Sequence, residues 1–425
     1  MDQLQQARQI ISQVDREMCD LFLRRMEAVR QVAEYKQARG LPVFDGAREQ
    51  EVLAQGAARV EDPALQEHYI RFLQNTMEVS KAYQRQLLAE PGVLRMELGS
   101  RSYDIRVERG CLHKAGQLLN LNRKVCIVTD SGVPEGYAKA LADQCAQPVI
   151  VTVDEGEDSK TMATVTRICQ VMVERGFTRR DCVAAVGGGM VGDLAGFAAA
   201  SFLRGVDFYN LPTTLLAQVD ASIGGKTGVN LDGVKNMVGA FHQPKAVLID
   251  PDTLETLPPR LMAEGMAEVV KMALTSDAAL FERLERENLP VEALLTGALA
   301  IKKAVVEQDE REAGLRKLLN FGHTIGHGVE SAAQGALYHG ECVALGMLPM
   351  CAPALRPRVE ALLKKLGLPT TVAVDKEAVW QAMLHDKKSH SEGFSAVFVE
   401  NPGEGSVKTV SFAEMKALLE GAWQE

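Results

Sequence analysis

The sequence predicts a multi-domain protein: an all-α N-terminal module of three helices, an α/β domain of nucleotide-binding type, and a mainly α-helical domain. Three observations predict this order. Apolar residues recur every three or four positions through residues 1–90, short β-rich runs alternate with helical stretches over 93–250, and helices dominate 251–425. At 425 residues the chain is too long for one ordinary core, so two or three domains are expected.

The composition is that of an ordinary soluble globular protein, with 46% hydrophobic and 24% charged residues. A net charge of −9 does not favour nucleic acid or an anionic membrane, so any acidic substrate must be bound by locally placed lysine and arginine. No apolar run approaches the roughly 20 residues of a membrane span, and no apolar signal core follows Met1. The eight cysteines are scattered without a Cys-x-x-Cys pair, so reduced thiols and a cytoplasmic location are expected.

Residues 1–90 are expected to form three helices. One long amphipathic helix begins near the N-terminus and ends at Gly40-Leu41-Pro42. Asp45 is a candidate N-cap for a second helix that continues through Val60, and Pro63 starts a third that runs to about Ala89.

The first helix carries basic residues where its apolar face should continue. Arg25 falls on the apolar stripe, and Lys36, eleven residues later, points the same way. Two cations on a solvated edge are the alternative interpretation. The same module holds further polar side chains, and together the set suits a small dicarboxylate: Arg8, Arg48, Ser80 and Gln84.

Arg8 adds a distance argument. It precedes Arg25 by seventeen residues, which is about 25 Å along a straight helix. One small ligand cannot contact both side chains from one helix. Arg8 would therefore reach the site from a second chain, and an intertwined homodimer is expected.

These residues resemble the all-helical chorismate mutase family over residues 1–90. The resemblance rests on Arg8 with Asp15, Arg25, Lys36, the segment Asp45-Gly46-Ala47-Arg48-Glu49, and Ser80 with Gln84. It implies rearrangement of chorismate to prephenate, which needs positioning and charge stabilisation but no cofactor. The residues that it assigns to chorismate are Arg8, Arg25, Lys36, Asp45, Arg48, Glu49, Ser80 and Gln84. An effector-binding module is the alternative function.

A glycine-rich turn lies within the α/β part. Residues 125–130, 149–153 and 182–186 are expected to be buried parallel strands, and Gly187–Asp193 follows the last of them and precedes a helix. This context is typical of a Rossmann-like site with a dinucleotide pyrophosphate at the helix N-terminus. A tightly packed turn without a ligand is the alternative. Asp130, Glu157 and Lys160 are candidates for the cofactor rim.

Cationic and hydroxyl side chains follow on glycine-rich loops between residues 203 and 241, where they suit phosphate groups. They are Arg204, Thr213, Thr214, Lys226 and Lys235, with Asn236 beside the last. Downstream, two histidines and a glutamate predict a three-ligand divalent-metal site with open positions, a form used in catalysis. The histidines are His323 and His339, although His327 shares a helix face with His323, and Glu264 shares one with Glu268.

Residues 93–425 resemble 3-dehydroquinate synthase. The motifs are Gly187–Asp193, Pro212–Lys226, Lys235-Asn236, Gly265–Lys271, Asn320–His327 and His339-Gly340-Glu341, in that order. The resemblance implies bound NAD, a divalent metal (zinc or cobalt) and the substrate 3-deoxy-arabino-heptulosonate 7-phosphate, which becomes 3-dehydroquinate and phosphate. The implied metal ligands are Glu268, His323 and His339.

The same resemblance implies the remaining site residues. Those assigned to NAD are Asp130, Glu157, Lys160, Gly188, Gly189, Gly192, Asp193, Thr213, Thr214 and Lys235. Those assigned to substrate and catalysis are Arg204, Asp220, Lys226, Asn236, Lys271, Lys302, Arg316, Asn320, His327 and Lys387. Two alternatives share this architecture: another sugar-phosphate cyclase, and a metal-dependent alcohol or glycerol dehydrogenase.

Overall fold

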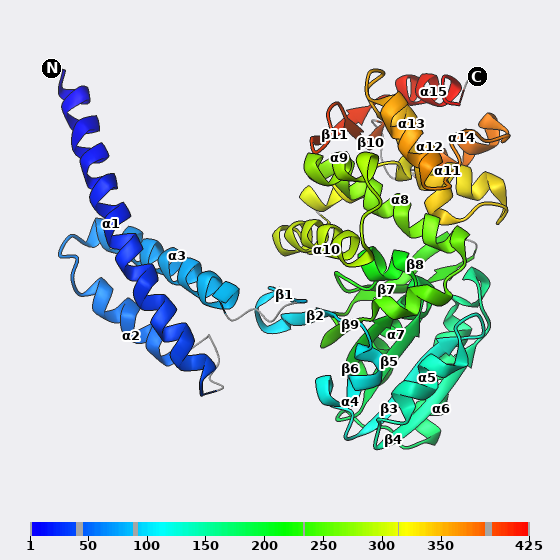
Figure 1. The fold of residues 1–425 in the computed structure, drawn as a ribbon, viewed down its shortest axis with the longest axis horizontal. Helices are drawn as coiled ribbons and strands as arrows, with labels where there is room; N and C mark the ends of the chain where they lie inside the picture. The colour runs from blue at the N-terminus through cyan, green and yellow to red at the C-terminus, as the bar shows by residue number, and fades with distance from the viewer. Residues whose placement is uncertain are drawn as a thin grey trace. The chain divides into compact units, whose positions relative to one another are not determined.

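The computed structural model describes residues 2–39, 46–87, 92–232, 234–312, 314–386 and 393–423. The chain forms two compact units, Met1–Val93 and Leu94–Glu425 (Figure 1). Among the helices within those ranges, none combines the length and the apolar character that crossing a membrane requires.

The described part of the first unit contains three helices, as predicted: α1 (Gln3–Gln37), α2 (Gly46–Ala57) and α3 (Pro63–Leu87). Val29 and Ala33 are buried where α1 packs against α3. Nearer the N-terminus of α1, apolar side chains are exposed, among them Leu4, Ile11 and Leu21. A single chain therefore leaves an apolar face of α1 uncovered.

One helix end in this unit, that of α2, differs from the prediction. Helix α1 ends at Gln37 with Ala38 as its C-cap, and α2 ends at Ala57 instead of Val60. The amide groups of the residues after Ala57 close turns onto preceding carbonyls, so the chain leaves the helix earlier than the apolar pattern indicates. Gly40-Leu41-Pro42 and Asp45 lie outside the described residues.

The second unit contains a seven-stranded sheet in the order β1-β2-β9-β6-β5-β3-β4. The pairs β2–β9, β9–β6, β6–β5, β5–β3 and β3–β4 are parallel. The strands are β1 (Val93–Met96), β2 (Tyr103–Val107), β3 (Lys124–Asp130), β4 (Gln147–Val153), β5 (Cys182–Gly187), β6 (Asp207–Pro212) and β9 (Ala246–Ile249). The three predicted strands are confirmed as the parallel strands β3, β4 and β5, but the prediction that all three are buried was wrong for β4, which lies at the sheet edge with Ile150 exposed.

Helices cover both faces of this sheet (Figure 1). They are α4 (Ala115–Leu118), α5 (Glu135–Ala142), α6 (Met162–Glu174) and α7 (Gly189–Ser201). Ile127 of β3 packs in one apolar cluster with Leu141 of α5, and the next residue, Val128, packs in another with Leu194 of α7. Burial on both faces explains why β3 is an uninterrupted apolar run.

The C-terminal helices pack around one further core, which includes Phe281, Phe321 and Met347. They are α8 (Pro259–Ser276), α9 (Ala278–Arg286), α10 (Val291–Gln308), α11 (His323–Ala333), α12 (His339–Met350), α13 (Arg356–Lys365), α14 (Lys376–Asp386) and α15 (Phe412–Glu420). The antiparallel strands β10 (Phe394–Val399) and β11 (Gly405–Val410) complete this part. The predicted fold class is confirmed.

The stretch expected to consist of glycine-rich loops instead contains an antiparallel hairpin, β7 (Lys226–Leu231) and β8 (Val234–Phe241). Gly228 and Gly239 face each other across it. A Cβ on Gly239 would clash with the Thr227 carbonyl oxygen, so the glycines permit close strand approach. The sequence interpretation was wrong here because it treated these glycines as loop formers.

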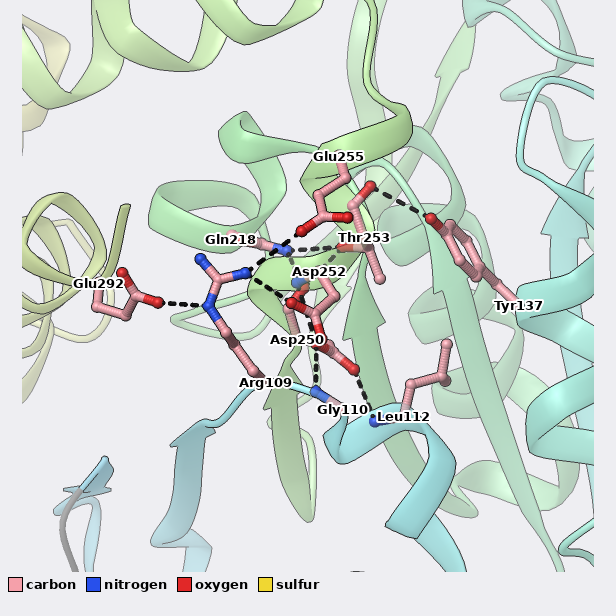
Figure 2. A network of polar contacts seen from close by, with 10 residues as sticks. All are labelled: Arg109, Gly110, Leu112, Tyr137, Gln218, Asp250, Asp252, Thr253, Glu255 and Glu292. Atoms are coloured by element: carbon pink, nitrogen blue, oxygen red, sulfur yellow. Dashed lines mark hydrogen bonds and ion pairs between the residues drawn. The ribbon is translucent and has the colours of Figure 1, made fainter. Parts of the chain in front are cut away.

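A polar network joins the end of β2 to the turn that follows β9 (Figure 2). The buried Asp250 carboxylate accepts hydrogen bonds from the amides of Gly110 at 2.9 Å and Leu112 at 3.0 Å. The Gln218 amide group donates to the Asp250 carbonyl oxygen at 3.1 Å and to Thr253 Oγ1 at 3.0 Å. Because Gln218 belongs to the π-helical turn η5 (Ala217–Ala221), the network holds this turn against the sheet.

Candidate active site

Two histidines and a glutamate from three helices converge in the second unit. Glu268 lies in the middle of α8, whereas His323 and His339 are the first residues of α11 and α12. Glu268 Oε1 lies 3.8 Å from His323 Nε2 and 3.7 Å from His339 Nε2. Ligand atoms of a tetrahedral zinc site lie about 3.4 Å apart, from bonds of about 2.0–2.2 Å. The donor set and its spacing therefore fit a divalent metal.

Electrostatics explain why a cation suits this position. Burial raises the pKa of Glu268, but the positive charges of Lys271 and His339 outweigh it and lower that pKa to about 2. Glu268 and Lys271 form a fully buried ion pair one helical turn apart. Within the described ranges, neither Glu268 oxygen makes a regular hydrogen bond. The carboxylate thus depends on neighbouring positive charge for compensation.

The two histidines differ. Burial lowers the pKa of His323 well below its ordinary value, and nearby Lys271 lowers it further, so this imidazole is neutral. Burial also lowers the pKa of His339, but the carboxylates of Glu268 and Glu330 outweigh that effect and raise it to about 10. His339 Nδ1 lies 3.4 Å from Glu330 Oε2. The His339 ring therefore lies between two carboxylates, with Nε2 toward Glu268 and Nδ1 toward Glu330.

Other candidate substrate residues surround this centre. Lys302 Nζ lies 2.5 Å from Asp220 Oδ1, on the π-helical turn. Burial lowers the pKa of Lys302. Burial raises the pKa of Asp220, but the positive charges of Lys302 and Lys271 outweigh this effect, so the pKa of Asp220 is lowered overall. The buried Arg316 guanidinium donates to the Glu310 carbonyl oxygen at 2.5 Å.

Glu312 is a residue that the sequence interpretation missed. Its carboxylate forms an ion pair with Lys226 and accepts a hydrogen bond from Asn320 Nδ2 at 2.5 Å. A cleft of about 400 Å³ opens here, lined by Arg311, Glu312, Lys317, Asn320, Thr324, Ser395, Val397 and Val407. No sequence motif identifies Glu312, because it lies in a segment of mixed charge whose backbone conformation depends on tertiary contacts. Its φ of 61° is unusual for a non-glycine residue and is visible only in the structure.

The glycine turn has the expected strand–turn–helix geometry. Strand β5 ends at Gly187, Gly188 is the N-cap of α7, and a Cβ on Gly192 would lie 3.1 Å from the Asn210 side chain. Thr213 donates its amide to the Gly187 carbonyl oxygen at 2.9 Å, so the end of β6 lies beside the turn. Thr214 Oγ1 accepts from the Ala217 amide at 3.2 Å.

Lys160 organises the rim of this turn. Its buried ammonium group lies 2.6 Å from Asp193 Oδ2 and 2.5 Å from Asn236 Oδ1, and the Glu157 carboxylate is 3.9 Å away. Burial raises the pKa of Asp193, and Lys160 opposes that effect. Asp130, at the end of β3, accepts backbone hydrogen bonds from the turn that follows it.

The other candidates differ in position: Lys235 and His327 lie close to the candidate metal ligands, whereas Arg204 is at the surface. Arg204 is exposed at the end of the short helix η4 (Phe202–Arg204), with a φ of 69°. Lys235 Nζ lies 2.6 Å from Glu330 Oε1 on α11, the helix that begins with His323. His327 is exposed, and its ring centroid lies 5.3 Å from that of His323. Lys387 lies outside the described residues.

Polar residues also gather between the three helices of the first unit. Arg25 and Ser80 both donate to the Thr76 carbonyl oxygen, at 3.3 and 2.7 Å. Gln84 is buried, and its Oε1 has no partner among the described residues. Burial lowers the pKa of Arg25.

The other residues predicted for the chorismate site differ in their exposure and in their partners. Glu49 pairs at 2.8 Å with Lys81, a buried lysine that the sequence interpretation missed although it follows Ser80 directly. Arg48 is exposed and pairs with Glu51 at 2.6 Å. Lys36 is half-buried. Arg8 is exposed on the N-terminal half of α1, and Asp45 is outside the described residues.

Comparison with known families identifies both parts of the chain. Residues 150–264 match the family described as 3-dehydroquinate synthase N-terminal, and residues 265–389 match 3-dehydroquinate synthase C-terminal. Residues 7–85 match chorismate mutase type II. The two resemblances drawn from the sequence are confirmed.

Individual relatives agree with these matches. A 3-dehydroquinate synthase of Geobacter metallireducens is 43% identical, covering 77% of this chain and 98% of the relative. The synthase of Streptococcus mutans is 41% identical, covering 77% and 99%. Among solved structures, 2-deoxy-scyllo-inosose synthase with carbaglucose-6-phosphate, NAD+ and Co2+ is 25% identical, with a TM-score of 0.71 over 78% of this chain and 100% of that one. The 2-epi-5-epi-valiolone synthase of Streptomyces hygroscopicus, with NAD+ and Zn2+, is 30% identical, with a TM-score of 0.69 over 76% and 96%.

Proposed function

Because the chain belongs to the 3-dehydroquinate synthase family and also matches chorismate mutase type II, we propose that it is a bifunctional enzyme of aromatic amino-acid biosynthesis. Residues 93–425 would convert 3-deoxy-arabino-heptulosonate 7-phosphate to 3-dehydroquinate and phosphate. Residues 1–90 would rearrange chorismate to prephenate. Within the synthase, nucleotide binding is assigned to 93–250 and metal binding to 251–425.

One observation carries the synthase assignment: Glu268, His323 and His339 converge within one ion's reach beside a buried lysine. Three protein ligands leave positions open for a substrate. A zinc or cobalt ion held there would supply a Lewis acid to the substrate's oxygens. Co2+ in the inosose synthase and Zn2+ in the valiolone synthase support this choice of metals.

NAD would bind along the glycine turn; both of those cyclases were solved with NAD+ bound. The turn between β5 and α7 would take the pyrophosphate at the helix N-terminus. Lys160 would hold the rim in shape through Asp193 and Asn236. The cofactor would supply both the hydride acceptor and the hydride donor of one turnover, so no net oxidation results.

The charged groups around the centre would bind and orient the sugar acid. Lys226 and Asn320 already hold a carboxylate, that of Glu312, which supports their role toward an anionic substrate group. The buried Lys302 and the half-buried Asp220 form a pair able to hold or move a proton at a substrate hydroxyl. The wider set proposed for substrate and catalysis adds Arg204, Asn236, Lys271, Arg316, His327 and Lys387.

A cyclase that makes an inosose or a valiolone is the second candidate, since two such enzymes share the fold and the cofactors. Identities of 41–43% to dehydroquinate synthases, against 25–30% to those cyclases, favour dehydroquinate. A metal-dependent alcohol dehydrogenase is disfavoured by the buried lysine pairs at the centre.

The mutase assignment rests on Arg25, Glu49, Ser80 and Gln84, which line one region between the helices. The exposed apolar face of α1 supports a homodimer in which Arg8 enters the partner's site. A regulatory module that senses chorismate or prephenate is the alternative.

All eight cysteines are free, in keeping with a cytoplasmic location.

Incubation of the protein with the heptulosonate phosphate, NAD and zinc should release phosphate and form dehydroquinate in equal amounts. Phosphate release without dehydroquinate would identify another cyclase, and net NADH production would identify a dehydrogenase. Chorismate loss is measured separately. Synthase rates over a range of chorismate and prephenate concentrations test the regulatory alternative.

A further inference from the structure

Two consecutive residues of β8 contact the two halves of the synthase site. Lys235 Nζ lies 2.6 Å from Glu330 Oε1, on the helix that begins with His323. Asn236 Oδ1 accepts from Lys160 Nζ at 2.5 Å, on the rim of the glycine turn. The hairpin therefore connects the candidate metal ligands with the candidate nucleotide rim.

The backbone of the hairpin departs from regular strand geometry near these two residues. The pairing register shifts between Val229 and Leu231, and Asn236 has a φ of 53°. The Asn236 amide donates to Asn230 Oδ1 at 2.9 Å, and the Asn230 side chain in turn donates to Glu157 at 3.0 Å. Asparagine tolerates a left-handed backbone better than most residues, so this conformation is stable at low cost.

Glu330 uses its two oxygens for different partners. Oε1 pairs with Lys235, and Oε2 faces His339 Nδ1 at 3.4 Å. The opposite ring nitrogen of His339 is the one that faces Glu268. A carboxylate on Nδ1 of a metal-binding histidine orients the ring and keeps Nε2 free for the metal.

Resting on the proposed function, we infer that Glu330 is a positioning residue for His339 and that the Lys235–Asn236 pair couples metal binding to nucleotide binding. A metal bound to His339 would fix the orientation of its imidazole ring. The ring would in turn fix the Glu330 carboxylate, and Glu330 would fix the Lys235 ammonium group. A nucleotide bound at the glycine turn would order the same hairpin through its contact with Asn236. Each ligand then favours the conformation that the other requires, and the coupling is reciprocal.

Zinc affinity, measured on metal-free full-length protein by competition with a chromophoric chelator, tests the first half. Glu330→Gln should weaken zinc binding by about 10–100-fold, the range for residues behind metal ligands. The matched control is Glu341→Gln. Glu341 is a buried carboxylate two residues after His339, but it pairs with Arg260 at 2.7 Å and does not face the imidazole. The control should change zinc affinity by less than about threefold.

NAD titrations with and without zinc test the second half. Wild-type protein should bind NAD several-fold more tightly with zinc present. Lys235→Met breaks the contact to Glu330, so its ratio of NAD affinities with and without zinc should approach one, while Lys235→Arg should retain the wild-type ratio. The ratio separates coupling from any direct contact between Lys235 and the nucleotide.

Equal zinc affinity in wild type and Glu330→Gln, or an equal loss in Glu341→Gln, would overturn the positioning role. An unchanged NAD ratio in Lys235→Met would overturn the coupling. If wild-type protein binds zinc no better than Glu268→Gln does, the proposed function itself fails. Urea unfolding followed by tryptophan fluorescence checks that each variant folds.

Discussion

Replacing Lys271 by methionine should destabilise the synthase unit more than any surface charge change. The side chains of Lys271 and Glu268 are 2% and 1% exposed, so the substitution leaves a carboxylate buried without its main counter-charge. Breaking such a pair costs about 3–5 kcal/mol, whereas exposed pairs contribute about 0.2–1 kcal/mol. The matched control, Arg283→Met, breaks the Arg283–Glu287 pair, which is about half exposed, and should cost less than about 1 kcal/mol.

The assay is urea unfolding with a chelator present, followed by tryptophan fluorescence. Both tryptophans, Trp380 and Trp423, belong to the Leu94–Glu425 unit, so the signal reports on that unit alone. Zinc should reduce the loss in Lys271→Met, because the ion compensates Glu268. The double variant with Glu268→Gln should recover much of the stability, since an uncharged pair needs no compensation. A loss below about 1 kcal/mol in chelator would show that Glu268 is compensated from elsewhere.

Three further changes test other parts of the molecule. Arg25→Ala should abolish chorismate turnover and leave dehydroquinate formation unchanged; parallel loss of both would contradict separate sites. Glu312→Gln removes the carboxylate that Lys226 holds, so the concentration of inorganic phosphate that half-inhibits the synthase should fall several-fold, and an unchanged value would argue against anion binding there. Asp250→Ala removes the acceptor of the buried Leu112 amide and of the half-buried Gly110 amide and should cost about 1–3 kcal/mol by urea unfolding, whereas Arg109→Ala, 47% exposed, should cost less than about 1 kcal/mol; similar losses would contradict the ranking by burial.

Local patterns predicted much of the architecture. The three N-terminal helices follow from apolar spacing and from Pro63, and β3, β4 and β5 follow from short apolar runs. The glycine turn was predictable because its strand and helix adjoin it in sequence. The β7–β8 hairpin was not predicted, since glycine favours loops unless another strand approaches closely, and the partner strand is a tertiary fact.

Residue types, their order and the local elements that carry them can be read along the chain. Glu268, His323 and His339 could be named as metal candidates from type and resemblance alone. Which side chains meet is set by tertiary packing: Glu330 with Lys235 and His339, Glu312 with Lys226, and Glu49 with Lys81. Helical and strand periodicity is a property of neighbours along the chain. Ion pairs between side chains of different elements depend on how those elements pack, which no local pattern records.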